Sequence, residues 1–202
     1  MRSMRVFAAL AALLSISAPV LAQGGSGFSD SYNFLKAVRD KDAYKAQQIA
    51  RKPGSTVVNT RDFTTGEQAL HIVTKRRDYG FMQLLLFNGA AVDGADKERN
   101  TPLILAATLA FPDGVRLLLS RKANVNAANA AGETALIKAV QALDAASARL
   151  LLDAGADPDK TDNVAGLSAR DYAERDRRAS AIARLIKDGT KKTAAPVQGP
   201  SL

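Results

Sequence analysis

The chain repeats itself every 33 residues, and this repetition restricts its fold more than any other feature. The phrase GEQALHIVTKRR at 66–77 returns as RNTPLILAATLA at 99–110 and as GETALIKAVQAL at 132–143, which places Leu70, Leu103 and Leu136 at equal steps of 33. The LLL triplets that begin at 84, 117 and 150 keep the same interval, as do the segments NGAAVD, RKANVN and AGADPD that follow them. Three features with one period predict a row of equal structural units.

Two short helices are predicted in each unit. Thr101 followed by Pro102 is typical of a helix start, because the hydroxyl caps a free N–H group and proline fits the first helical position. The apolar LLL stripe predicts the second helix, and Gly89 and Gly155 are suited to end it. Neither helix can bury its apolar face alone, so each pair must pack against its neighbours.

The Thr-Pro-Leu of residues 101–103, the LLL…GA endings and the 33-residue step resemble the ankyrin repeat, whose family motif is T-P-L-H-x-A. The resemblance implies an all-α solenoid of helix-turn-helix units joined by short β-turn or hairpin loops. We expect about five units including degenerate caps. These are an N-terminal cap at 30–62, repeats at 63–95, 96–128 and 129–161, and a C-terminal cap at 162–187 that lies one residue out of phase.

Three positions depart from the family pattern. Arg99 stands where the opening glycine is usual, Lys122 replaces the glycine that ends the second helix, and Gln68-Ala69 replaces Thr-Pro. These departures leave the period unchanged. We therefore expect lower local stability at these turns within an intact architecture.

Residues 1–22 are predicted to be a signal peptide cleaved after Ala22. Arg2 and Arg5 precede an almost wholly apolar stretch, and Val20 and Ala22 supply the small side chains of a cleavage site. An uncleaved membrane anchor is the alternative, but the stretch is shorter than the roughly 20 apolar residues that a spanning helix needs. We therefore expect a periplasmic or secreted protein.

The segments beside the helical units are predicted to lack a packed structure. Residues 23–29 form a flexible linker rich in glycine. Residues 188–202 contain hardly any apolar side chain larger than alanine, which predicts a disordered tail. The chain has no cysteine, which excludes a disulfide framework, a thiol nucleophile and a thiolate metal site. Its formal net charge is +8 and becomes about +6 once Arg2 and Arg5 are removed.

No pattern in the sequence predicts an enzyme, a metal or a cofactor. His71 is the one histidine, and it occupies the H of the ankyrin motif. The resemblance implies that it is a structural residue that hydrogen-bonds neighbouring turns rather than a general base. The segment DPDKTD at 157–162 has the alternating aspartates of a calcium loop but lacks the loop's glycine and its bidentate glutamate. No phosphate loop, nucleophile elbow or zinc spacing occurs.

The resemblance implies a binding surface on the concave side of the stack, made by the positions that vary in the family. The basic residues Lys75 and Arg76 fall there at the end of a first helix, and we expect both side chains to be exposed. The full candidate set is Thr64, Thr65, Glu67, Lys75, Arg76, Lys97, Glu98, Asn100, Thr108, Leu109, Ala130, Ala131, Glu133, Gln141 and Ala142.

Two functions follow from these features. The first is a non-enzymatic module that binds a partner protein through the concave face, with an acidic partner favoured by the basic residues. The alternative is a basic envelope protein that binds anionic lipid or lipopolysaccharide phosphate. Export argues against nucleic acid as a partner. The identity of the partner, a role as inhibitor, chaperone or assembly factor, and the oligomeric state stay open.

Overall fold

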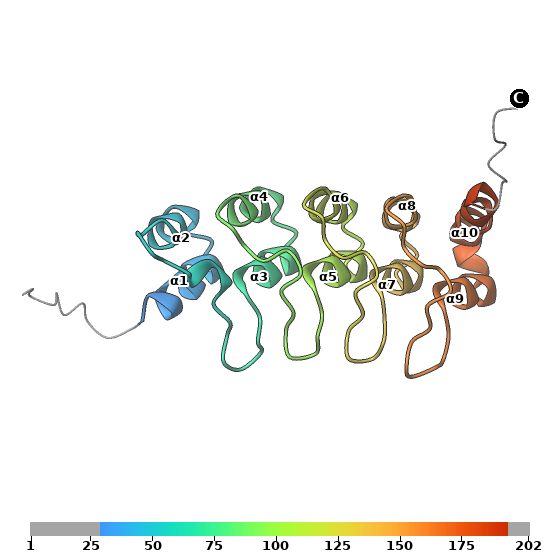
Figure 1. The fold of residues 1–202 in the computed structure, drawn as a ribbon, viewed down its shortest axis with the longest axis horizontal. Helices are drawn as coiled ribbons and strands as arrows, with labels where there is room; N and C mark the ends of the chain where they lie inside the picture. The colour runs from blue at the N-terminus through green and yellow to red at the C-terminus, as the bar shows by residue number, and fades with distance from the viewer. Residues whose placement is uncertain (1–28, 194–202) are drawn as a thin grey trace, which may run out of the picture.

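In the computed structural model, residues 29–193 are described, and they form five helix pairs in one row (Figure 1). The predicted signal peptide, residues 23–28 of the linker and residues 194–202 of the tail lie outside the described residues. The pairs are α1 (Asp30–Arg39) with α2 (Ala43–Ala50), α3 (Ala69–Lys75) with α4 (Tyr79–Phe87), α5 (Pro102–Thr108) with α6 (Pro112–Ser120), α7 (Ala135–Gln141) with α8 (Ala145–Asp153), and α9 (Ala169–Arg175) with α10 (Ser180–Thr193).

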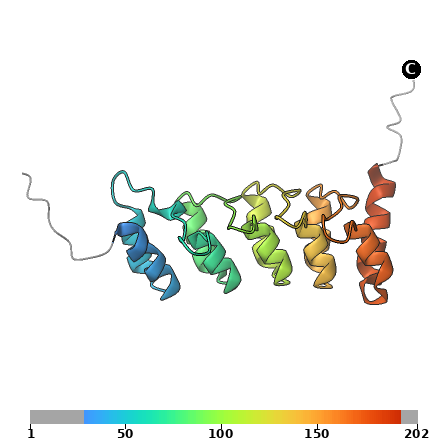
Figure 2. The same cartoon turned by 90° about the horizontal axis from the view of Figure 1, so that it is seen from below.

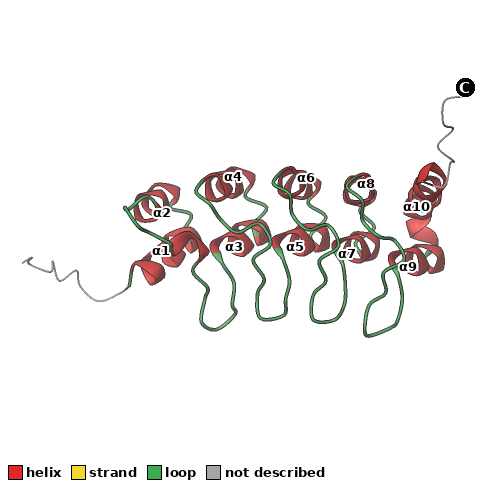
Figure 3. Ribbon diagram, viewed as in Figure 1, coloured by secondary structure: helices red, strands yellow, loops and turns green. Residues whose placement is uncertain are grey.

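The helices form two layers. Helices α1, α3, α5, α7 and α9 make an inner layer, α2, α4, α6, α8 and α10 make an outer layer, and long loops project beyond the inner layer (Figures 1 and 2). Within the described residues no strand forms (Figure 3). Two isolated antiparallel bridges, Ala128 with Thr134 and Thr161 with Ser168, close two of the projecting loops. The all-α solenoid of helix-turn-helix units is therefore confirmed.

Local sequence sets the ends of these helices. The hydroxyls of Thr101 and Thr134 accept hydrogen bonds from the N–H groups of Ile104 and Ile137 and so cap α5 and α7. Proline occupies the first turn of α5 and of α6, where its missing N–H costs no hydrogen bond. Short 3-10 turns lie before α3 (Val57–Asn59) and before α10 (Arg177–Ala179).

The repeated leucines lie at the centre of the stack. Leu70, Leu103 and Leu136 are at most 1% exposed, and Ala106 and Ala139 beside them are fully buried. Small side chains allow the inner helices to approach closely, so the apolar face of each pair is covered by the pairs on either side. Among the described residues, no helix is both long and apolar enough to pass through a bilayer.

Polar bonds tie each loop to the next along the row. Backbone N–H groups of Lys97, Ala130 and Asn163 donate to carbonyls in the preceding loop, at 3.1, 2.8 and 2.8 Å. In a second series, a side-chain oxygen accepts a hydrogen bond from a backbone N–H of the next unit, at 2.7 to 2.9 Å. The acceptor and donor pairs are Asn59 with Ala91, Asp93 with Asn124, and Asn126 with Asp157. The loops are therefore held in register with one another.

Two of the departures from the family pattern carry backbone strain. Arg99 has φ 62° and Lys122 has φ 65°, in the left-handed region that favours glycine. A non-glycine residue pays about 1–2 kcal/mol there. Both turns therefore hold left-handed backbone strain, and their lower local stability stays a prediction.

Replacing Lys122 by glycine is expected to stabilise the protein by up to about 1 kcal/mol, because the relief of left-handed strain exceeds the roughly 0.5–1 kcal/mol entropy cost of glycine. The Lys122 side chain is exposed at the end of α6. Thermal unfolding followed by circular dichroism measures the shift, and Lys122→Ala, which keeps the strain, is the matched control. A glycine variant no more stable than the alanine variant would contradict the strain argument.

The last helix extends further than expected. Helix α10 continues to Thr193, so residues 188–193 are helical and not part of a disordered tail. Ile182 and Ile186 are 1% exposed and anchor the helix on the preceding units. Once a helix is anchored, each added residue gains a hydrogen bond without a new nucleation cost. This explains why α10 continues beyond its last apolar residues.

Candidate functional site

The candidate residues lie together on one side of the stack. They lie in the loops 62–67, 96–100 and 129–133 and on the exposed sides and ends of α3, α5 and α7. We call these loops and helix surfaces together the inner face. None of the fifteen is buried: eight are exposed, and seven, Glu67, Arg76, Asn100, Leu109, Ala131, Glu133 and Ala142, are partly buried. The candidate residues of all three repeats are therefore accessible from outside the stack.

A hollow of about 370 Å³ lies on the inner face between the loops of the first two repeats. Six candidate residues line it together with two that the sequence did not single out, Asp96 and Leu105. The six are Thr64, Thr65, Glu67, Lys75, Glu98 and Asn100. Residues from two repeats thus meet in one concave site.

Fixed carboxylates shape the hollow. The Lys75 ammonium forms an ion pair with Glu67. Asp96 accepts hydrogen bonds from the N–H groups of Glu98 and Asn100, at 2.9 and 2.8 Å. The Asn100 amide donates to Asp96 at 3.1 Å and to Glu98 at 3.2 Å. The wall of the hollow is therefore ordered before any partner arrives.

Arg76 does not have the exposed position that the sequence suggested. Its guanidinium donates to the carbonyls of Val38 at 2.5 Å and Arg39 at 3.3 Å, and it pairs with Asp78 at 3.3 Å. The side chain is 21% exposed and lies 5.8 Å from the ring centroid of Phe81. The expectation of exposure was wrong for Arg76, because a long side chain at a helix end can reach the carbonyl groups of the preceding unit. Lys75 is exposed as expected.

The third repeat contributes a carboxylate, that of Glu133, whose charge is already paired with Lys138. Glu133 accepts from Asn129 at 3.0 Å, Lys138 at 3.2 Å and Gln141 at 3.4 Å. Burial raises the pKa of Glu133, but these hydrogen bonds and the Lys138 charge outweigh it and leave the pKa below its ordinary value. The inner face therefore differs between its two ends: Asp96 and Glu98 in the second loop form hydrogen bonds but no ion pair within residues 29–193, whereas Glu133 in the third is paired with Lys138.

Asp62 holds the first loop in place. The backbone N–H of Thr65, together with the Arg39 guanidinium at 2.6 Å and the N–H of Thr64, lowers the pKa of Asp62 to about 2. Its carboxylate accepts from the N–H groups of Thr64 and Thr65 at 2.8 Å each. This residue therefore orders the loop that carries Thr64 and Thr65.

Sequence reasoning missed the two most exposed apolar side chains of these loops. Phe63, at the tip of the first loop, is 96% exposed, with the Lys97 ammonium 5.7 Å from its ring centroid. Val164 in the loop before α9 is 82% exposed. A large apolar residue within a polar turn was the available signal.

His71 has the structural role that the resemblance implied. It is fully buried, its Nδ1 accepts from the N–H of Gln68 at 3.2 Å, and its Nε2 lies 3.0 Å from the carbonyl oxygen of Asn100 in the next repeat. Burial lowers the pKa of His71 below 6.5. A neutral ring that donates from Nε2 satisfies both contacts, so this side chain links two repeats.

The aspartates of residues 157–162 are engaged by protein groups. Asp159 pairs with Arg170 at 2.7 Å. Asp162 accepts the Tyr172 hydroxyl at 2.7 Å and the N–H group of Ala165 at 2.6 Å. Across residues 29–193, no three histidine, cysteine, aspartate or glutamate side chains form a group that could hold a metal ion.

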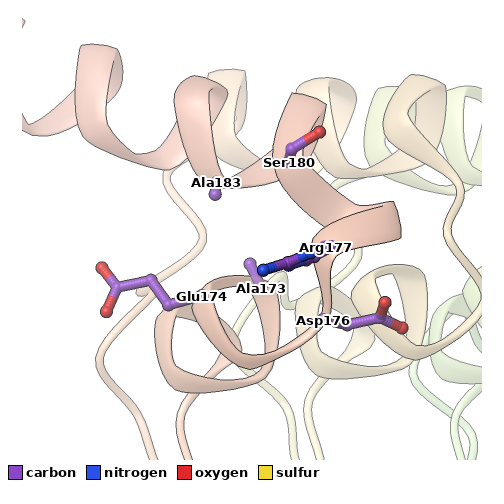
Figure 4. Close-up of a pocket in the computed structure, with 6 residues that line it drawn as sticks. All are labelled: Ala173, Glu174, Asp176, Arg177, Ser180 and Ala183. Carbon is purple, nitrogen blue, oxygen red and sulfur yellow. The ribbon is translucent and has the colours of Figure 1, made fainter.

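A second hollow, of about 530 Å³, lies between α9 and α10 at the end of the row (Figure 4). Ala173 and Ala183 supply its apolar surface, and the charged and polar side chains beside them are Glu174, Asp176, Arg177 and Ser180. Asp176 is paired with Arg178 at 2.8 Å. This hollow contains none of the fifteen candidate residues.

Comparison with known proteins finds the repeats over the same part of the sequence. Residues 34–129 and 70–162 match a family model described as ankyrin repeats in three copies. The chain is 40% identical over 91 residues to a putative ankyrin repeat-containing protein of Treponema pallidum, covering 45% of this chain and 30% of that protein. It is 32% identical over 135 residues to ankyrin repeat and SOCS box protein 6 of Homo sapiens, covering 62% and 31%. The chain thus spans about 30% of the length of these curated relatives.

Proposed function

Because the chain belongs to the ankyrin repeat family, whose repeats are generally protein–protein interaction modules, we propose that it binds a partner protein through its inner face. The family generally serves as non-enzymatic scaffolding, and we propose that this chain likewise holds its partner rather than transforming it. The observation that carries the proposal is the hollow in which six variable-position side chains from two repeats meet.

The ordered surface around the hollow supports this function. Hydrogen bonds between successive loops fix the spacing of the contact residues, so binding would cost little conformational entropy. The apolar tip residues Phe63 and Val164 and the small side chains Ala130 and Ala131 supply surface that a partner can cover. Such a pre-formed, partly apolar surface suits a folded protein.

The ion pairs of Lys75 and Arg76 bear on the chemistry of the partner. The sequence favours an acidic partner because it predicts that Lys75 and Arg76 are exposed cations. Lys75 instead pairs with Glu67, and Arg76 binds backbone carbonyls and Asp78. The argument for an acidic partner therefore loses its support.

We also propose that the protein is exported. The pattern of residues 1–22 supports this, with two arginines, an apolar stretch and small residues before the cleavage point. The intact mass of the chain recovered from its own cells tests the proposal, since cleavage after Ala22 removes 22 residues. A full-length mass would contradict cleavage.

The alternative, binding to an anionic lipid surface, rests on the formal net charge of +8. On the inner face Lys75, Arg76 and Lys138 are already paired with carboxylates. A mainly electrostatic association would collapse as salt rises, whereas a packed protein interface would survive in part. Flotation with phosphatidylglycerol vesicles at low and high salt distinguishes the two.

Site-specific photocrosslinking tests the inner face directly. A photoreactive residue replaces exposed Thr108, at the end of α5 on the inner face, or exposed Arg149, on α8 in the outer layer. In an extract of the source cells, we expect a covalent adduct of defined mass from position 108 and none from position 149. Adducts from position 149 alone, or equally from both, would contradict binding through the inner face.

A further inference from the structure

The hollow of the inner face combines acidic walls with apolar surface. Three carboxylates, those of Glu67, Asp96 and Glu98, line it against one ammonium, that of Lys75. Lys75 is already paired with Glu67, so two carboxylates have no cationic partner within the hollow. Leu105, from α5, is partly buried and adds apolar surface to the same space.

Such a space suits a side chain with an apolar stem and a cationic end. Arginine carries an apolar stem of three methylene groups and a planar cation that binds carboxylates through paired hydrogen bonds. The stem can lie on Leu105 while the guanidinium reaches Asp96 and Glu98. A carboxylate in the same place would be repelled by Asp96 and Glu98, and the Lys75 ammonium is already paired with Glu67.

Resting on the proposed function, we propose that the hollow binds an arginine side chain of the partner protein, and that an apolar residue beside this arginine covers Phe63. The exposed ring stands on the loop that also carries Thr64 and Thr65, two of the residues that line the hollow. Aromatic and arginine anchors at the centre of a contact commonly carry most of its binding energy. The partner is thus a protein with a basic and apolar segment.

The placement of Lys97 agrees with this arrangement. Its ammonium lies 5.7 Å from the Phe63 ring centroid and is not among the groups that line the hollow. The hollow therefore keeps its excess of carboxylates although the whole chain is basic. Local charge complementarity sets which group binds, whereas net charge mainly affects the association rate.

Peptide titration of the purified chain tests the assignment. The probes are the acetylated and amidated pentapeptides Ala-Leu-Arg-Leu-Ala and Ala-Leu-Glu-Leu-Ala, followed by amide chemical shifts. We expect saturable shifts at Thr65, Glu98 and Asn100 with the arginine peptide, at an affinity at least tenfold above that of the glutamate peptide. Equal affinities, or saturable shifts confined to other residues, would overturn it.

Matched variants separate the site from general charge effects. Glu98→Gln should weaken arginine-peptide binding at least threefold, whereas Asp153→Asn, an exposed carboxylate on α8, should leave it unchanged. Phe63→Ala should weaken binding, whereas Phe87→Ala, which removes a ring 74% exposed on α4, should not. Equal effects within either pair would overturn the proposal. An inner-face crosslink at position 108 without arginine-peptide binding would overturn the arginine assignment alone, and crosslinks only at position 149 would overturn the proposed function.

Discussion

Replacing Leu103 by alanine is expected to lower the free energy of unfolding by about 2–5 kcal/mol, the range for a buried leucine that leaves a cavity. Leu103 is 1% exposed in α5, the inner helix of the central repeat, which contacts both α3 and α7. Because each unit of a solenoid is stabilised by its neighbours, the damage should spread to both sides. Urea unfolding followed by far-ultraviolet circular dichroism measures the loss.

The control for this substitution lies on the same helix. Leu105 is partly buried and lines the hollow, so Leu105→Ala should cost clearly less than Leu103→Ala. Hydrogen exchange should also rise in α3 and α7 of the Leu103 variant. If both alanine variants lose the same stability, the leucine repeat does not form the core of the stack.

Replacing His71 by isoleucine is expected to cost about 1–3 kcal/mol, the range for one buried polar group left without a partner, here the N–H of Gln68. The variant loses the ring that accepts from Gln68 and contacts the Asn100 carbonyl. Ile104 and Ile137 occupy the equivalent positions and are buried, so isoleucine fits the space. The urea midpoint reports the loss, and Ile104→Val, expected to cost about 0.5–1.5 kcal/mol, is the comparison.

The same residue predicts a pH dependence. Burial holds the pKa of folded His71 below the ordinary value of 6.5, so the unfolded chain binds this proton more readily. The stability that neutral His71 contributes is therefore complete above pH 6.5 and is lost as the pH falls through the folded pKa. Since the chain has one histidine, His71→Ile should remove this slope between pH 7.5 and 5. A variant that keeps the full slope would contradict the assignment.

The architecture could be predicted from the sequence because its signals are periodic. The leucine period, the threonine caps and Pro102 each depend only on local chemistry and appear in the structure where they were expected. The phase shift of the last unit also has a visible cause. The loop closed by Thr161 and Ser168 is one residue longer than the loop closed by Ala128 and Thr134.

The details of the candidate site depend on contacts between units, which a linear pattern does not contain. Arg76 donates a hydrogen bond to the carbonyl of Val38 in the preceding helix pair, and Lys75 forms an ion pair with Glu67. Asp96 enters the hollow only because two loops are tied side by side. The family resemblance therefore indicated the candidate positions, whereas their charge balance depends on the folded arrangement.

The central claim is that the rigid inner face is where a partner protein binds. Hydrogen–deuterium exchange of the chain alone and with its crosslink-identified partner tests this claim most directly. The account predicts added protection in the loops 62–67, 96–100 and 129–133 and at the ends of α3, α5 and α7, with α2, α4, α6 and α8 unchanged. Protection concentrated on those outer helices, or none at the loops, would contradict it.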